Sequence, residues 1–473
     1  MKYADYAKWT NRATQWIETH FATLRDKPVR AQTQIGEIAA RLPASPPEHA
    51  TDMETIIADF EHIVPDGITH WQHPRFFAYF QSNAAPASMI AEQLTNAIAA
   101  QCMLWQTSPA ATEIEQVMID WFRQAMALPD GFKGVIQDSA SSATLSAVLT
   151  MRERATGFTG NDTGLSTQPR LRIYCSEQVH SSIDKACWVA GIGQDNLIKI
   201  PTNSAYQMDP AALQSAITAD RAAGHTPAGV ILCTGGTSIG ACDDLPPVLA
   251  ISRAEDLYTH LDAAWAGSAM ICPELRDIWV GAENCDSIVF NPHKWLGANF
   301  DCSIQFLKDP DIQRRTMGLR PSYLETPQAS EITNFNEWTV PLGRRFRALK
   351  LWFLVRAYGL EGLRERMRNH VKWAQELEAK LAAHPDFTIT THSRLSLFTF
   401  QHTPANADPN TASANLLQKI NDDGRIYLTQ TLHNGAFVIR FVAGQFDCTR
   451  DDVMLAYDVI TELANSAPTG DQS

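Results

Sequence analysis

Between about residues 130 and 310, short apolar runs rich in valine and isoleucine alternate with longer stretches of helical character. The runs occupy residues 135–136, 171–174, 230–233, 257–261, 287–290 and 304–307. Short apolar runs separated by helices are typical of strands that are buried on both faces of a sheet. The pattern therefore predicts an α/β fold in which helices flank a mostly parallel central sheet.

The chain on either side of this region has a helical pattern. Residues 1–80 predict helices that are interrupted by a proline cluster at 43–47. Farther along, apolar residues recur at steps of three and four, which places them on one face of a helix. These residues are Leu363, Met367, Val371, Ala374, Leu377 and Leu381. We expect this helix to begin near Gly362 and to stop at His384-Pro385, and we expect a strand at 437–442 in a smaller α+β segment.

These changes of pattern predict three parts. They are an N-terminal helical segment at 1–84, a large cofactor-binding domain at 85–348 and a small C-terminal domain at 349–473. A chain of 473 residues can bury a large core without disulfides or metals.

Composition and charge exclude several classes of protein. The chain has 39 basic and 52 acidic residues, a net charge of −13, so it lacks the basic surface that nucleic-acid or anionic-membrane binding needs. No apolar run approaches the roughly 18 residues of a membrane span, and the N terminus has no signal-peptide pattern. Nine scattered cysteines without a CxxC pair favour free thiols in a cytoplasmic protein over disulfides or zinc.

Polar and small residues follow the predicted strands, at the edge where open α/β sheets bind their ligands. Residues 137–144 are small and hydroxyl-rich and open a helix, which is the arrangement of a phosphate cradle. His180 follows the next run, Thr237 the run at 230–233, and Asp262 the run at 257–261. Each signal is weak alone, since serine caps and structural histidines are common.

Lys294 is a stronger indication of a functional site than these residues. It lies between the apolar run at 287–290 and Trp295-Leu296, although lysine is rarely buried. Desolvation frees a lysine amine to act as a nucleophile toward carbonyls. A lysine, a carboxylate, an imidazole and a phosphate cradle are together the groups that bind pyridoxal phosphate.

Two other readings of the motifs are weaker. Gly236-Thr237-Ser238-Ile239-Gly240 matches the G-x-S-x-G pattern of α/β serine hydrolases, and Asp262 and His293 follow in that order. A hydrolase using Ser238 needs a helix directly after the serine, but Pro246 and Pro247 follow instead. Neither HExxH nor paired CxxC occurs, so no metal site is predicted.

Several long motifs resemble the group II pyridoxal-phosphate-dependent decarboxylases, with the aromatic-L-amino-acid decarboxylases as the nearest branch. The motifs are Asn291-Pro292-His293-Lys294-Trp295, His260-Leu261-Asp262-Ala263-Ala264, Phe76-Phe77-Ala78-Tyr79-Phe80 and Pro341-Leu342-Gly343-Arg344-Arg345. They extend over nearly the whole chain.

The resemblance implies a fold-type-I, aspartate-aminotransferase-like enzyme that forms a homodimer with its active sites at the subunit interface. The N-terminal segment then wraps over the partner subunit. Lys294 matches the lysine that binds the cofactor covalently, Asp262 the carboxylate beside the pyridine nitrogen, and His180 the imidazole that stacks on the ring. The further cofactor contacts that the resemblance implies are Ser82, Ala140, Ser141, Thr237, Asn291 and His293.

Tyr323 matches the family's loop tyrosine, which protonates the carbanion left after CO₂ departs. In related aldehyde synthases of insects this position is phenylalanine, so Tyr323 favours simple decarboxylation to an amine. Residues 314–337 contain glycine, prolines and many polar groups, and we expect them to form a mobile lid.

The expected substrate is an aromatic L-amino acid: tryptophan, tyrosine, phenylalanine or its dihydroxy analogue. Histidine or an acidic amino acid is the alternative on the same fold. The expected substrate-binding residues are Trp71, Tyr79, Phe80, Gln101 and Met103. The sequence departs from the family pattern at Ser82, Asp138 and Trp265, which leaves the preferred substrate open.

Overall fold

The computed structural model of the chain describes residues 1–319 and 332–466. Its Cα atoms group into two compact units. The larger unit contains Ser82–Lys372 and Ser393–Leu397, and the smaller contains Met1–Gln81, Trp373–His392 and Phe398–Ser473. The division into parts at 1–84, 85–348 and 349–473 stays a prediction.

A seven-stranded sheet forms the centre of the larger unit, with the strand order β1-β7-β6-β5-β4-β2-β3. The strands are β1 (Lys133–Gln137), β2 (Leu171–Ser176), β3 (Leu197–Ile200), β4 (Thr226–Cys233), β5 (Tyr258–Asp262), β6 (Ser287–Phe290) and β7 (Ser303–Leu307). The neighbours from β3 through β6 are parallel, whereas β7 is antiparallel to both β1 and β6. The predicted mostly parallel sheet and its six strands are confirmed.

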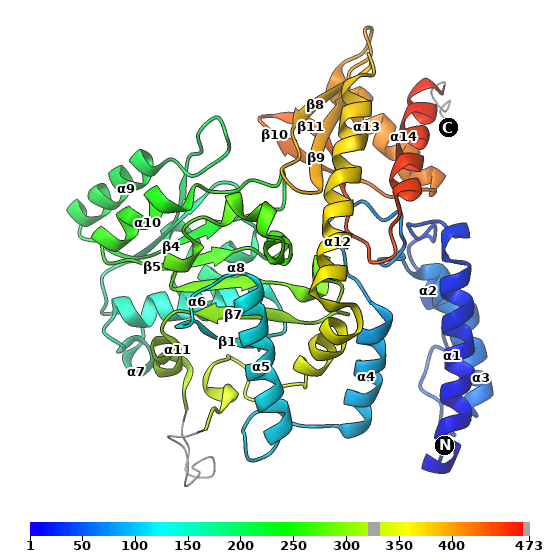
Figure 1. Cartoon of the computed structure of the whole chain (residues 1–473), viewed down its shortest axis with the longest axis horizontal. Coiled ribbons are helices and arrows are strands. Elements are labelled where there is room, and N and C mark those ends of the chain that lie inside the picture. Colours follow the sequence, from blue (N-terminus) through cyan, green and yellow to red (C-terminus); the bar gives the residue numbers. More distant parts are fainter. Residues whose placement is uncertain (320–331, 467–473) are drawn as a thin grey trace. The chain divides into compact units, whose positions relative to one another are not determined.

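Helices lie on both sides of this sheet (Figure 1). They are α4 (Pro86–Ile98), α5 (Pro109–Ala125), α6 (Ala140–Ala155), α7 (Gly160–Thr163), α8 (Ser182–Val189), α9 (Pro210–Ala222), α10 (Leu245–Ala254) and α11 (Pro310–Met317). α6 packs across β1 and β4–β7, and its buried side chains Ala147, Val148 and Met151 join an apolar core with Ile173 and Ile231. Burial of these side chains holds α6, and therefore its N terminus, against the sheet.

The segment expected to be a lid, 314–337, is partly helical. α11 continues to Met317, and a 3₁₀ turn spans Phe335–Glu337. Residues 314–317 and 335–337 are therefore helical, where we predicted a loop. Residues 320–331, which include Tyr323, lie outside the described residues.

The smaller unit contains helices and a four-stranded sheet. Its order is β10-β11-β9-β8, with β8 (Phe387–Thr391), β9 (Leu397–His402), β10 (Thr429–His433) and β11 (Ala436–Val442). The helices are α1 (Tyr6–Ala22), α2 (Glu37–Ala40), α3 (Met53–Ile63), α13 (Pro409–Asp423) and α14 (Arg450–Asn465). The strand expected at 437–442 and the interruption of the early helices around 43–47 are confirmed.

A long helix, α12 (Ala348–Ala382), contributes to both units. All six residues of its predicted apolar face are buried, and it ends two residues before His384, as expected. The expected start near Gly362 was wrong, because the helix begins at Ala348 and is only interrupted at Gly359, where φ is 63°. Glycine accepts this left-handed backbone at little cost. No helix in the described residues is both long and apolar enough to cross a membrane.

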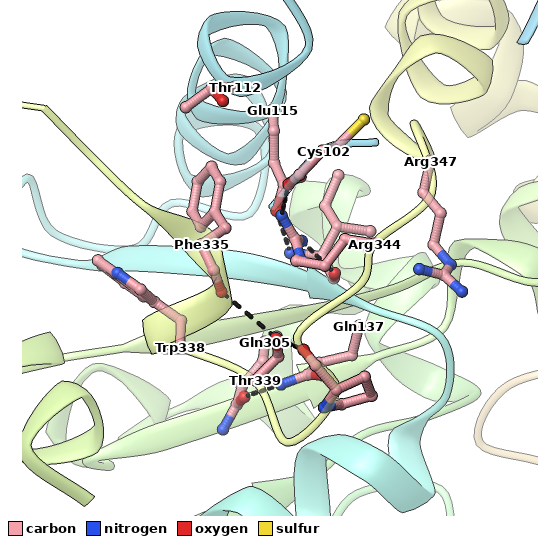
Figure 2. Close-up of polar contacts among 12 residues, drawn as sticks. Cys102, Thr112, Glu115, Gln137, Gln305, Phe335, Trp338, Thr339, Arg344 and Arg347 are labelled. Carbon is pink, nitrogen blue, oxygen red and sulfur yellow. Dashed lines mark hydrogen bonds and ion pairs between the residues drawn. The ribbon is translucent and has the colours of Figure 1, made fainter. Parts of the chain in front are cut away.

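A buried ion pair fixes the end of β1 (Figure 2). Arg344 and Glu115 have side chains that are each 3% exposed, and their charged groups lie 2.6 Å apart. Arg344 also donates to the Ile136 carbonyl at 2.7 Å, and the Ile136 N–H donates to Glu115 at 2.8 Å. The guanidinium lies over the Phe335 ring, 4.8 Å from its centroid. α5, β1 and the chain at Arg344 are therefore joined at one buried charge pair.

Replacing Arg344 by methionine should lower the free energy of unfolding by about 3–5 kcal/mol, because it leaves the Glu115 carboxylate buried without its cation. Urea unfolding followed by far-UV circular dichroism measures this loss. Arg345→Met is the control, since Arg345 is 53% exposed and pairs with Glu92 at the surface, where less than about 1 kcal/mol is expected. Equal losses in the two variants would contradict the assignment.

Candidate active site

The predicted cofactor residues lie at one edge of the large sheet. Ala140 and Ser141 follow β1, His180 follows β2, Thr237 follows β4, Asp262 ends β5, and Asn291, His293 and Lys294 follow β6. Because β7 is antiparallel to both β1 and β6, these two strands run in the same direction. The carboxyl ends of all five strands therefore meet at the edge where such sheets bind ligands.

Lys294 lies in a π-helical turn, Pro292–Leu296, which follows β6. Its backbone leaves the helical conformation, with φ −90° and ψ −112°, and its N–H donates to the Asn291 carbonyl at 2.9 Å. The Asn83 side chain donates to the Lys294 carbonyl at 2.7 Å, which places neighbouring Ser82 close to the turn. Sequence reasoning missed Asn83, because an amide 211 positions away carries no local signal.

Two stacked tryptophans support this turn. The Trp295 ring lies 5.0 Å from that of Trp265, with an angle of 12° between the planes, and both residues are buried. The Trp295 indole N–H donates to His370 Nδ1 of α12 at 2.9 Å. Trp265, which departs from the family pattern, therefore packs directly against the residue that follows Lys294.

Asp262 and His180 interact electrostatically with the Lys294 region. Asp262 is 8% exposed, and its Oδ1 accepts the Ala264 N–H at 3.0 Å. Desolvation lowers the pKa of His180, the charge of Asp262 opposes this shift, and the charge of Lys294 adds to it. The charges of Asp262 and Lys294 therefore both act on the His180 ring at this edge of the sheet.

The tautomer of His180 follows from its hydrogen bonds. Nδ1 accepts the backbone N–H of Ser182 at 3.1 Å, and the Ser182 hydroxyl lies 2.9 Å from the same nitrogen. A nitrogen that accepts a hydrogen bond carries no proton, so the neutral ring is protonated at Nε2. The lowered pKa favours this neutral form.

The N terminus of α6 lies at this edge of the sheet, and its use as a phosphate cradle stays a prediction. The Ser139 hydroxyl accepts the Ser142 N–H at 3.2 Å and caps the helix, leaving the preceding N–H groups at its open end. Ala140 packs with Val289 and Ala264, so this helix end lies beside the ends of β5 and β6. N–H groups and the helix dipole at such an end attract anions.

Asn291 and His293 are buried and bonded to the protein. Asn291 Oδ1 accepts the Ser303 hydroxyl at 2.6 Å, and His293 Nδ1 accepts the Cys302 N–H at 2.9 Å. Burial, together with the charge of Lys294, lowers the pKa of His293 to about 3, so this ring is neutral. Both side chains tie the Lys294 turn to β7, and their predicted contacts with the phosphate stay predictions.

The hydrolase motif has the wrong local structure. Ser238 lies in a turn after β4, and α10 begins only at Leu245. The strand–serine–helix elbow that the mechanism needs is therefore not formed. Within residues 1–319 and 332–466, no group of three or more His, Cys, Asp or Glu side chains is arranged to hold a metal ion.

The predicted substrate residues lie in both units, so their joint use stays a prediction. In the smaller unit Trp71 and Tyr79 are partly exposed and stacked 5.8 Å apart, whereas Phe80 is buried beneath the Arg440 guanidinium. In the larger unit Gln101 Oε1 accepts the Arg344 N–H at 2.7 Å, and Met103 is half-buried.

The donor set at the sheet edge fits pyridoxal phosphate. It contains a half-buried lysine amine for the aldehyde, a buried carboxylate for the ring nitrogen, a neutral imidazole and a helix N terminus for the phosphate. These are the groups through which proteins bind and tune this cofactor.

Comparison with known proteins gives the same answer. Residues 36–403 match the model of the pyridoxal-dependent decarboxylase conserved domain. The chain is 36% identical to the aromatic-L-amino-acid decarboxylase of Rattus norvegicus, covering 98% of each protein. It is 35% identical to the phenylacetaldehyde synthase of Arabidopsis thaliana, covering 95% of this chain and 94% of that protein.

The crystal structure of Oryza sativa TDC with PLP and tryptamine superposes with a TM-score of 0.95 at 32% identity, covering 98% of each chain. The similarity thus extends over both units and includes the sheet edge that carries Lys294. From its fold, its donor set and these relatives, we conclude that the chain belongs to the pyridoxal-dependent decarboxylases, carboxy-lyases whose cofactor is pyridoxal phosphate.

Proposed function

We propose that the enzyme removes CO₂ from an aromatic L-amino acid and releases the corresponding amine. The observation that carries this proposal is the grouping of Lys294, Asp262 and His180 at one sheet edge. Relatives that cover nearly the whole chain include an aromatic-L-amino-acid decarboxylase and a TDC solved with tryptamine, which support the aromatic choice.

In this proposal each residue has a physical role. Lys294 holds the cofactor covalently, Asp262 keeps the pyridine nitrogen protonated, and the flat face of His180 stacks on the ring. The N–H groups of Ala140 and Ser141 hold the phosphate, with Ser82, Thr237, Asn291 and His293 around it. The bound cofactor supplies an electron sink for the pair left when CO₂ departs.

Tyr323 decides which product leaves the enzyme. We assign it the protonation of the substrate Cα after CO₂ departs, on the strength of its sequence motif. A related phenylacetaldehyde synthase makes aldehyde formation the second candidate function. The phenol of Tyr323 favours the amine, because it supplies the proton that ends the reaction at this stage.

The active enzyme in this proposal is a homodimer with its sites at the subunit interface, and residues 1–84 wrap the partner. An apolar face on α4 supports a dimer, since Ile90, Leu94 and Ile98 are spaced by four and are 55%, 44% and 60% exposed. The residues expected to surround the aromatic side chain of the substrate are Trp71, Tyr79, Phe80, Gln101 and Met103.

A cytoplasmic location completes the proposal. All nine cysteines are free thiols, and all are buried. Thiols persist in a reducing compartment.

Borohydride should fix the cofactor to Lys294 and bleach the yellow protein, because reduction makes the bond to the lysine permanent. Peptide mass spectrometry after reduction locates the label. Lys294→Ala should give no label, whereas Lys308→Ala, which removes an exposed lysine, should keep it. A label on any other lysine would contradict the assignment.

Product analysis over a panel of amino acids tests the substrate. Tryptophan, tyrosine, phenylalanine and the dihydroxy analogue should give amine at rates at least about tenfold above histidine and glutamate, because an aromatic ring buries apolar area that the others lack. Preferred turnover of glutamate or histidine would instead support the alternative decarboxylases.

Tyr323→Phe should suppress the amine at least about tenfold, since proton transfer by a positioned side chain contributes this much or more. Dioxygen then takes the electron pair, and aldehyde, ammonia and hydrogen peroxide form alongside CO₂. Chromatography of the products and a peroxidase assay measure the change. Tyr3→Phe, at a tyrosine that is 99% exposed, is the matched control, and an unchanged amine yield in Tyr323→Phe would remove this residue from the mechanism.

A further inference from the structure

Two carboxylates lie at the end of the sheet where the phosphate cradle begins. Asp138 directly precedes the cap residue Ser139, whose hydroxyl donates to Asp138 Oδ1 at 2.9 Å. The antiparallel register pairs Gln137 with Ser303, so Asp138 and Asp301 lie at the same end of β1 and β7. Negative charge here opposes binding of a phosphate, which carries between one and two negative charges near neutral pH.

Arg347 pairs with Asp301, and the charge of Asp138 also acts on its guanidinium. Its side chain is 13% exposed, and its Nε lies 2.7 Å from Asp301 Oδ1. Burial alone lowers the pKa of this guanidinium, but the hydrogen bond to Asp301 and the charges of Asp301 and Asp138 raise it above its ordinary value. Figure 2 shows Arg347 apart from the buried Arg344–Glu115 pair, so the two arginines serve different carboxylates.

Other basic groups also lie in this region. Lys350 pairs with Glu92 at 2.7 Å and also donates to the carbonyl of Asp301 at 3.2 Å. His293 is neutral, because burial lowers its pKa to about 3. Arg347 is therefore the cation whose side chain pairs with the Asp301 carboxylate and on which the charge of Asp138 also acts.

We propose that Arg347 is a positioning residue for the cofactor phosphate, and that it acts by neutralising Asp138 and Asp301 at the mouth of the α6 cradle. The proposal rests on the assignment of the phosphate to the N terminus of α6. It requires no contact between Arg347 and the phosphate, since charge compensation acts over several ångströms in a partly buried site.

Cofactor affinity tests this role without any measurement of turnover. The full chain, freed of cofactor, is titrated with pyridoxal phosphate and separately with pyridoxal, which lacks the phosphate, and absorbance gives each Kd. Arg347→Gln should raise the Kd for pyridoxal phosphate about tenfold and leave the Kd for pyridoxal unchanged. A general loss of structure would weaken both ligands equally and would overturn the proposal.

A second substitution tests the compensation itself. Arg347→Gln combined with Asp138→Asn should recover most of the lost affinity for pyridoxal phosphate, because it removes the charge that Arg347 offsets. Asp138→Asn alone should leave the Kd within about threefold, and the exposed control Arg345→Gln should leave it unchanged. No recovery in the double variant would show that Asp138 is not what Arg347 neutralises.

Ser141→Asp separates this inference from the assignment on which it rests. A carboxylate within the cradle should weaken pyridoxal phosphate but not pyridoxal. If Ser141→Asp has this effect and Arg347→Gln does not, the cradle stands and the role of Arg347 is refuted. If neither variant has the effect, both assignments fail, while the amine product remains a separate test of the proposed function.

Discussion

β7 runs against both of its neighbours, β1 and β6, and this reversal keeps those two strands parallel to each other. The helix N terminus that follows β1 and the lysine turn that follows β6 therefore open on the same edge. Had β7 been parallel to either strand alone, the N terminus of α6 and Lys294 would lie at opposite ends of the sheet. The direction of β7 therefore determines whether these groups lie at the same edge of the sheet.

Placing a lysine in a half-buried turn leaves backbone groups that must find partners. Asn83 binds the carbonyl of Lys294, and Arg366 binds those of the two residues that follow it. The buried Trp265–Trp295 stack packs at the same turn. The lysine is thus positioned by groups that take no part in the chemistry.

The sequence allowed the parallel sheet to be predicted because it depends on local patterns. The cofactor residues were predicted from the strand ends and from the family resemblance, and their roles stay predictions. Apolar runs mark strands, and the motif after Phe290 is recognisable from the local sequence, without knowledge of which residues lie near it in space. β3 was missed because it has only four residues, with Lys199 exposed among them. The Arg344–Glu115 and Asn83–Lys294 contacts span 229 and 211 positions, and single-chain periodicity carries no signal for such pairs.

The hydrogen bond from the Ser182 N–H to His180 favours the uncharged form of the imidazole ring near Asp262. A cationic imidazole could pair with Asp262 and would compete with the pyridine nitrogen for the same carboxylate. By donating to Nδ1, the backbone N–H of Ser182, the first residue of α8, keeps the ring uncharged. In the roles proposed for these residues, Asp262 then has one proton to stabilise rather than two, and the reaction's electron sink depends on a hydrogen bond made by a main-chain amide.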